Sequence, residues 1–213
     1  MDEGAAIDRQ RNAGNEIRLI GRQKQRGVCD VPRRAHLVAQ RDPSIAGGRN
    51  LSSAFAGHAG ARVSTSNGRA TILRFAEEGA KVLAVDNNLS SAEETVAIAR
   101  QAGGECVAFE ADVAVEATLA AMVEAARRRW GRTDVLHYNV GVSIAGGDAP
   151  LDEITEPAFD RIATINLRGA IMACKHVLPL MRAPRAGVII TISSVAAWEQ
   201  YPNVAYKATK ATG

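Results

Sequence analysis

From residue 66 onward, short apolar segments alternate with longer amphipathic ones. The short segments are KVLAVD (81–86), CVAFEADV (106–113), DVLHYNVG (134–141) and GVIITISS (187–194). Their centres are continuously apolar rather than apolar at every second residue, which is typical of parallel strands buried on both faces. The pattern predicts an α/β fold in which a doubly wound parallel sheet is covered by helices on both faces. Ligands of such sheets bind beyond the carboxyl ends of the strands.

The segments between the strands predict the helices. Helical spacing covers 67–79, 90–104 and 115–131, and one long helix is expected within 155–182. A last helix begins near residue 203, shortly before the sequence ends at Gly213. The helices predicted over 90–104, 115–131 and within 155–182 each connect two predicted strands, as parallel pairing requires.

The first 60 residues have no sustained hydrophobic period and are rich in arginine. We expect a basic, poorly patterned and disordered or solvated segment over 1–60, and a folded domain over 61–213. An incorrectly assigned start or a wrong-frame translation would give the same pattern. The segment contains no recognisable groove-reading motif, so we expect no nucleic-acid partner despite its charge. No convincing first strand precedes residue 66, which predicts an incomplete sheet.

Composition narrows the cellular setting. The three cysteines, Cys29, Cys106 and Cys174, lack metal-ligand spacing, so no metal site is expected and a reducing compartment is indicated. No apolar run approaches the roughly 18 residues that span a bilayer, and the polar start does not resemble a secretory signal. We therefore expect a cytoplasmic protein without a membrane partner.

Polar residues stand where predicted strands end. Asp86 ends the strand over 81–86, where an acidic side chain can bind the ribose hydroxyls of a dinucleotide and repel a 2′-phosphate. This favours NAD over NADP, and the alternative is a simple helix or turn cap. Asp112 is placed to meet an adenine edge. Asn139 and Gly141 follow the next strand, where the alternative is an ordinary turn.

The most reactive arrangement lies near the end of the chain, in NVAYKATKATG. Tyr206 and Lys210 are four residues apart, which places them on one face of a helix. Free tyrosine has a pKa near 10, and a neighbouring ammonium lowers it by favouring the phenolate. Ser193 and Ser194 close the preceding strand and can hydrogen-bond a substrate oxygen. The alternative is a pair of solvent-facing neighbours.

Several ordered motifs identify a family: RFAEEGAKVLAVD, ADV, DVLHYNVG, ATINLRGA, VIITISSVAA and YKATK. Together, over residues 67–213, they strongly resemble the short-chain dehydrogenase/reductase family. The resemblance implies that 61–213 is a Rossmann-fold dinucleotide-binding and catalytic domain, which moves hydride between NAD(P) and an alcohol or carbonyl compound. The substrate class stays open among secondary alcohols, sugars, steroids and acyl ketones. The alternative is a non-catalytic nucleotide-binding or interaction module.

The resemblance also assigns roles to individual residues. Tyr206 would be the general acid/base, and Lys210 would bind the ribose and lower the tyrosine pKa. Ser194 would orient the carbonyl, with Ser193 as the alternative, and Asn166 would help to hold a proton-relay water. The implied cofactor-binding residues are Gly68, Asp86, Asp112, Val113, Asn139, Gly141, Tyr206 and Lys210.

The sequence departs from the family pattern at three places. Tyr138 and Val140 replace the Asn and Ala of the usual Asn-Asn-Ala-Gly. In the glycine-rich phosphate loop, Gly68 matches the last glycine, whereas Ser66 and Arg62 occupy the positions of the other two, with Gly60 as a substitute in a longer loop. The chain also ends at Gly213, where family members continue, so we expect a C-terminally truncated domain. Family members are usually homo-oligomers, and their interface would be incomplete here.

Overall fold

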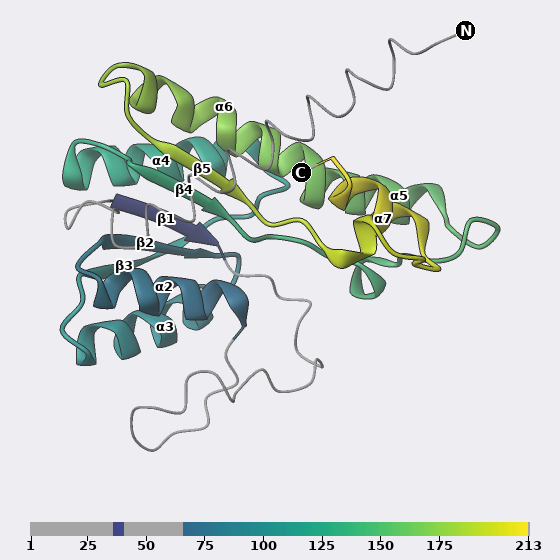
Figure 1. The fold of residues 1–213 in the computed structure, drawn as a ribbon, viewed down its shortest axis with the longest axis horizontal. Coiled ribbons are helices and arrows are strands. Elements are labelled where there is room, and N and C mark those ends of the chain that lie inside the picture. The colour runs from purple at the N-terminus through teal and green to yellow at the C-terminus, as the bar shows by residue number, and fades with distance from the viewer. Residues whose placement is uncertain (1–35, 41–65, 213) are drawn as a thin grey trace, which may run out of the picture. The chain divides into compact units, whose positions relative to one another are not determined.

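The computed structural model describes residues 36–40 and 66–212. In this part of the chain, five parallel strands form one sheet in the order β3-β2-β1-β4-β5 (Figure 1). The strands are β1 (His36–Gln40), β2 (Lys81–Asp86), β3 (Cys106–Glu110), β4 (Val135–Tyr138) and β5 (Val188–Thr191). The strand order reverses direction at β1 and β4, as in a doubly wound sheet.

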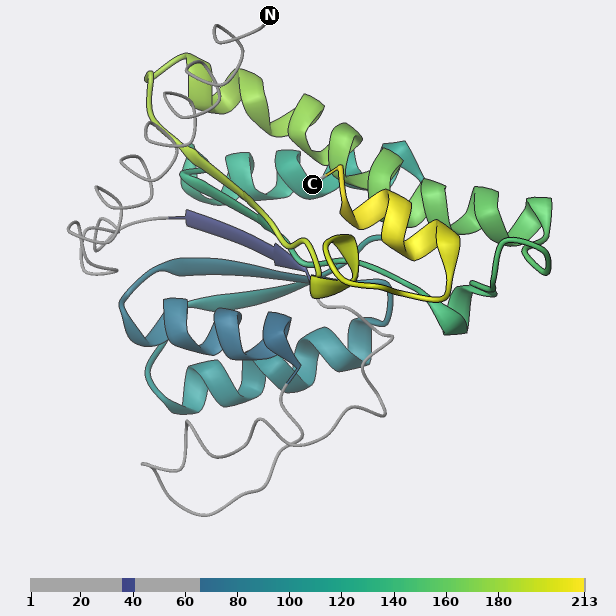
Figure 2. The same ribbon diagram turned by 45° about the vertical axis from the view of Figure 1, so that its right-hand side comes forward.

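Helices cover both faces of this sheet. The helices α2 (Asn67–Glu77) and α3 (Leu89–Gln101) lie on one face, and α4 (Glu116–Trp130) and α6 (Gly169–Arg182) lie on the other (Figures 1 and 2). The largest described core cluster packs α4 and α6 against the sheet. Among its members, Leu119, Met122 and Leu136 are fully buried. The predicted α/β Rossmann-like architecture is confirmed. No helix in the described ranges has the length and apolarity to span a membrane.

The central strand is the main difference from the sequence-based expectation. No convincing strand was expected before residue 66, yet the backbone of residues 36–40 pairs with both β2 and β4. A five-residue strand between polar segments is too short to show a period of its own. Its pairing satisfies the backbone groups of two neighbouring strands at once. The rest of the expected disordered segment lies outside the described residues.

The helix expected within 155–182 is interrupted. It consists of α5 (Glu156–Ala163), the π-helical turn η4 (Thr164–Arg168) and α6. Within η4, the carbonyl oxygen of Ile165 accepts a hydrogen bond of 2.8 Å from the hydroxyl of Tyr138 on β4. A Cβ at Gly169 would lie 2.5 Å from that hydroxyl oxygen, so glycine permits the close approach. Single π-helical turns occur frequently at functional sites.

Two short loops and a last helix complete the described domain. The 3-10 turn η3 (Ile144–Gly146) lies in the loop after β4, and the 3-10 turn η5 (Val195–Ala197) follows β5. The helix α7 (Val204–Lys210) packs against α5, η4 and η5. All these segments follow carboxyl ends of strands, which in a parallel sheet meet at one edge.

Candidate active site

The carboxyl edge of the sheet gathers the predicted site residues. Asp86 ends β2, Asn139 follows β4, and the two serines 193 and 194 follow β5. Asp112 comes two residues after β3 and is exposed. Because all five described strands are parallel, these positions lie along the same edge.

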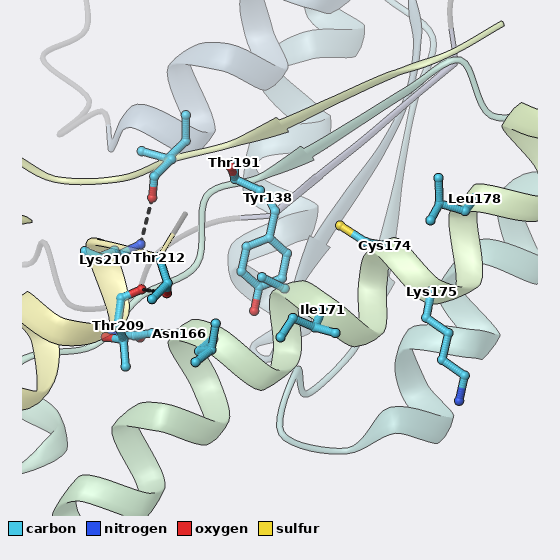
Figure 3. Close-up of a pocket in the computed structure, with 13 residues that line it drawn as sticks. Tyr138, Asn166, Ile171, Cys174, Lys175, Leu178, Thr191, Thr209, Lys210 and Thr212 are labelled. Atoms are coloured by element: carbon cyan, nitrogen blue, oxygen red, sulfur yellow. Dashed lines mark hydrogen bonds between the residues drawn. The ribbon is translucent and has the colours of Figure 1, made fainter. Parts of the chain in front are cut away.

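Lys210 occupies the space between the ends of β4 and β5. Its side chain is 7% exposed, and its Nζ donates hydrogen bonds to the carbonyl oxygens of Val140 (3.0 Å) and Ile192 (2.9 Å; Figure 3). A buried ammonium requires such acceptors, because burial without them is costly. The two carbonyls therefore hold the positive charge at a defined point of the edge.

Tyr206 lies one helical turn before Lys210 on α7 and is half-buried. The Nζ atom of Lys210 lies 5.8 Å from the centroid of the Tyr206 ring. The two side chains thus share one side of the helix, as the spacing predicted. The ammonium therefore lies within cation–π distance of the Tyr206 ring.

Asn166, in the π-helical turn, is buried and joins the loop after β4 to α7. Its Oδ1 accepts from the Val142 backbone N–H (2.8 Å), and its Nδ2 donates to the Val142 carbonyl oxygen (3.0 Å). The same Nδ2 lies 3.0 Å from the hydroxyl oxygen of Thr209 on α7. The side-chain amide therefore fixes the distance between these segments.

The two serines have different partners. Ser193 donates its hydroxyl to the backbone carbonyl oxygen of Lys210 at 2.5 Å and so binds the end of α7. Ser194 is half-buried, and its Oγ accepts from the Ala196 N–H at the start of η5 (3.2 Å). Within residues 66–212, no acceptor is recorded for the Ser194 hydroxyl hydrogen.

The residues predicted to bind the cofactor also have structural roles in the fold. Asp86 is 6% exposed, and its Oδ1 accepts from the Asn88 N–H at 3.0 Å, so the turn-cap alternative describes one of its interactions. Gly68 is buried in the first turn of α2, after the N-cap Ser66. Val113 belongs to the core cluster. Arg62 and Gly60 lie outside the described residues.

Two observations test whether this edge fits a dinucleotide. The Nδ2 of Asn139 is buried and has no hydrogen-bond partner among the described residues. An orphaned buried amide is rare unless a ligand or water satisfies it. At Gly141, a Cβ would lie 2.9 Å from the Lys210 Nζ, so the backbone passes directly beside the ammonium. Both features fit a polar ligand at the carboxyl edge.

Two functional candidates escaped the sequence reading. In the sequence, Tyr138 is distinguished only as a replacement for an Asn of the family motif, whereas in the structure its hydroxyl binds the π-helical turn that holds Asn166. Burial raises the pKa of Tyr138 above its ordinary value, so it stays protonated as a donor. Asp148 was not singled out. It is 7% exposed and accepts from the backbone N–H groups of Ala205 and Tyr206. The one nearby sequence feature that marks Asp148 is the pair of glycines before it, Gly146 and Gly147, which predicts a turn.

A mainly apolar cavity of about 460 Å³ lies between α6, β5 and the end of α7 (Figure 3). Asn166 and Lys210 reach it, together with Ile171 and Cys174 of α6. Tyr206 and Ser194 are not among the residues that line this cavity. Burial raises the pKa of the Cys174 thiol, which does not favour a reactive thiolate.

Comparison with known proteins gives a consistent result. The family model described as "short chain dehydrogenase" matches residues 64–213. Levodione reductase of Leifsonia aquatica is 35% identical over 130 residues, which cover 60% of this chain and 48% of that protein. The chain spans about half the length of the curated relatives that it matches.

Solved structures agree. A short-chain dehydrogenase/reductase from Burkholderia xenovorans matches with a TM-score of 0.68 and 31% identity, covering 84% of this chain and 62% of the other. A 7α-hydroxysteroid dehydrogenase complexed with NADH and 7-oxo glycochenodeoxycholic acid matches with a TM-score of 0.64 and 32% identity, covering 68% and 56%.

Proposed function

The chain belongs to the short-chain dehydrogenase family, and on that premise we propose that it forms the cofactor-binding and acid/base part of an NAD(P)-dependent oxidoreductase. The reaction would interconvert an alcohol and a carbonyl compound. The Lys210 ammonium, held 5.8 Å from the Tyr206 ring centroid by two backbone carbonyls, carries this proposal. A phenol beside a fixed cation is suited to exchange a proton near neutral pH.

In this proposal, Tyr206 donates a proton to the carbonyl oxygen during reduction and removes it during oxidation. Ser194 donates a hydrogen bond to the same oxygen, and a donor fixed in advance stabilises charge that develops there. Ser194 is favoured over Ser193, because the Ser193 hydroxyl already binds the Lys210 carbonyl oxygen. Asn166 keeps α7 at its distance from β4 through Val142 and Thr209.

The proposed cofactor is NAD. A bound nicotinamide would supply the hydride chemistry that no side chain provides. Asp86 ends β2 in a buried position where its carboxylate would accept ribose hydroxyls and repel a 2′-phosphate. Asn139, Gly141 and Lys210 would hold the ribose and nicotinamide side, with Gly68, Asp112 and Val113 along the remaining edge. The similar solved structure of a 7α-hydroxysteroid dehydrogenase was determined with NADH bound, which is compatible with NAD as the cofactor.

We also propose a small-molecule alcohol or carbonyl substrate and a cytoplasmic location. Cys106 and Cys174, the two cysteines within the described ranges, are both free thiols, which is typical of a reducing compartment. Steroids are among the candidate substrates, because one similar solved structure is that of a hydroxysteroid dehydrogenase.

The proposal is tested by binding and turnover on the purified chain. We expect NADH to bind with enhanced nicotinamide fluorescence and to be oxidised when a panel of ketones and aldehydes is added. Tyr206→Phe should abolish oxidation and leave NADH affinity within about two-fold. Absence of binding at millimolar NADH would contradict the proposal for this chain, and binding without turnover across the panel would support a nucleotide-binding module instead.

Lys210 has a matched control in the same helix. Lys207 lies about one helical turn before Lys210, and its ammonium binds the Glu199 carbonyl oxygen instead of those of Val140 and Ile192. We expect Lys210→Met to lower both NADH affinity and turnover, by about ten-fold or more. Lys207→Met should leave both within about two-fold. Equal effects of the two substitutions would show that the lysine position has no special role.

A further inference from the structure

We propose that Asp148 is a positioning residue that holds Tyr206 in place from the loop after β4. Its Oδ1 accepts from the Ala205 N–H at 3.0 Å, and its Oδ2 accepts from the Tyr206 N–H at 3.1 Å. The next residue continues the contact, because the carbonyl oxygen of Ala149 accepts from the Val204 N–H at 3.1 Å. The inference rests on the proposed acid/base role of Tyr206.

The helix α7 needs this support because it has no cap of its own. It contains seven residues, and Asn203 before it makes no side-chain capping bond. Short helices are marginal in water, and their first N–H groups lack partners within the helix. Asp148 and Ala149 together satisfy the first three, from 55 or more residues earlier in the chain. A carboxylate also interacts favourably with the positive end of a helix.

The loop is built to deliver this carboxylate. Asp148 is 7% exposed and accepts a third hydrogen bond, from the Ser143 hydroxyl at 3.2 Å. Gly147 has a φ of +94°, in the left-handed region that favours glycine. A Cβ at Gly146 would lie 2.9 Å from the Val142 side chain. The two glycines therefore allow the chain to turn so that the next residue faces α7.

The same network reaches the Tyr206 ring. The Ser143 hydroxyl lies 2.9 Å from the Tyr201 hydroxyl. The Tyr201 ring centroid lies 5.8 Å from that of Tyr206, at an interplanar angle of 49°. At its other end, α7 is held by Lys210 through Val140 and Ile192. Asp148 thus holds the backbone of Tyr206 at one end of α7, and the ammonium of Lys210 is held at the other end, beside the Tyr206 ring.

The test compares four proteins: the native chain, Asp148→Ala, Asp148→Asn and Asp152→Asn. Asp148→Ala removes both side-chain oxygens that accept from the backbone N–H groups of Ala205 and Tyr206, whereas Asp148→Asn keeps one side-chain carbonyl oxygen. Asp152 is an exposed aspartate four residues later and serves as the matched control. Amide hydrogen exchange of Ala205 and Tyr206 is followed by NMR, with the buried strand β2 as the reference for the intact fold.

We expect exchange at Ala205 and Tyr206 to be about ten-fold or more faster in Asp148→Ala, since a lost cap contributes on this scale. Asp148→Asn should be intermediate, and Asp152→Asn should match the native chain. Exchange in β2 should not change. The ring proton resonances of Tyr206 should move toward those of an exposed tyrosine in Asp148→Ala and recover partly in Asp148→Asn.

Three results would overturn the proposal: unchanged exchange at Tyr206, a uniform increase that includes β2, or faster amide exchange with unchanged ring resonances. The last would reduce Asp148 to a helix cap without influence on the phenol. If Asp148→Ala does not fold, Asp148→Asn decides by the same criteria. None of these measurements requires cofactor, so a failure of NADH binding would contradict the proposed function separately.

Discussion

Gly141 and Lys210 approach so closely that a Cβ at residue 141 would lie 2.9 Å from both Cε and Nζ of the lysine. The loop after β4 and the helix α7 are thus in direct contact at the point where the ammonium binds the Val140 carbonyl oxygen. The identity of residue 141 therefore controls where the cation sits relative to Tyr206.

Gly141→Ala is expected to displace the lysine head group rather than unfold the protein. The clashing atoms form the flexible end of a side chain, so the free energy of unfolding should fall by only about 1 kcal/mol. NADH affinity should fall by about ten-fold, because the displaced ammonium loses its carbonyl partners. Thermal unfolding measures the change in stability, and NADH titration measures the change in affinity. Native affinity in this variant would show that the close approach has no functional consequence.

Tyr138→Phe is expected to destabilise the π-helical turn. The substitution leaves the Ile165 carbonyl oxygen without its 2.8 Å donor, and such a loss costs about 1–3 kcal/mol. Tyr201→Phe is the comparison, because Tyr201 is half-buried and its hydroxyl partner Ser143 has another bond. Chemical denaturation of both variants gives the free energies of unfolding. An equal or larger loss in Tyr201→Phe would contradict the role assigned to Tyr138.

Asp86→Ser is expected to weaken the preference for NADH over NADPH. A like-charge contact between a carboxylate and a phosphate costs several kcal/mol, so the ratio of the two dissociation constants should change by about ten-fold or more. Glu110→Gln is the matched control, since Glu110 is exposed and is the register partner of Asp86 on β3. Cofactor titrations measure both ratios. A similar change in the two variants would exclude a specific role for Asp86.

His137 is expected to make the fold sensitive to mild acid. Burial lowers the pKa of His137 below its ordinary value, so the folded protein keeps the ring neutral while the unfolded chain protonates near pH 6.5. The unfolded state therefore binds more protons as the pH falls below about 6.5, and stability decreases until the lowered folded-state pKa is reached.

The slope from this single group is at most about 1.4 kcal/mol per pH unit. Urea denaturation between pH 7.5 and 5 measures it, with the native chain and His137→Leu in parallel. The variant should lose the part of the slope below about pH 6.5. Parallel curves for the two proteins would refute the assignment to His137.

The sequence by itself determined the layers of the fold and the common helical face of Tyr206 and Lys210. Continuous apolar segments such as 81–86 identify buried parallel strands, because a strand covered on both faces has no polar side. The spacing of Tyr206 and Lys210 identifies their common face, because helical geometry is local. Both properties depend on residues close together in the chain.

Only the tertiary structure decided the rest. The strand 36–40 gains its place from pairing with β2 and β4, not from a period of its own. The π-helical turn accepts a hydrogen bond from the Tyr138 hydroxyl, and the first turn of α7 donates to Asp148, 57 residues before Ala205. Ser193 is distinguished from Ser194 by its bond to the Lys210 carbonyl oxygen. Each of these contacts joins residues distant in sequence, so local periodicity contains no signal for them.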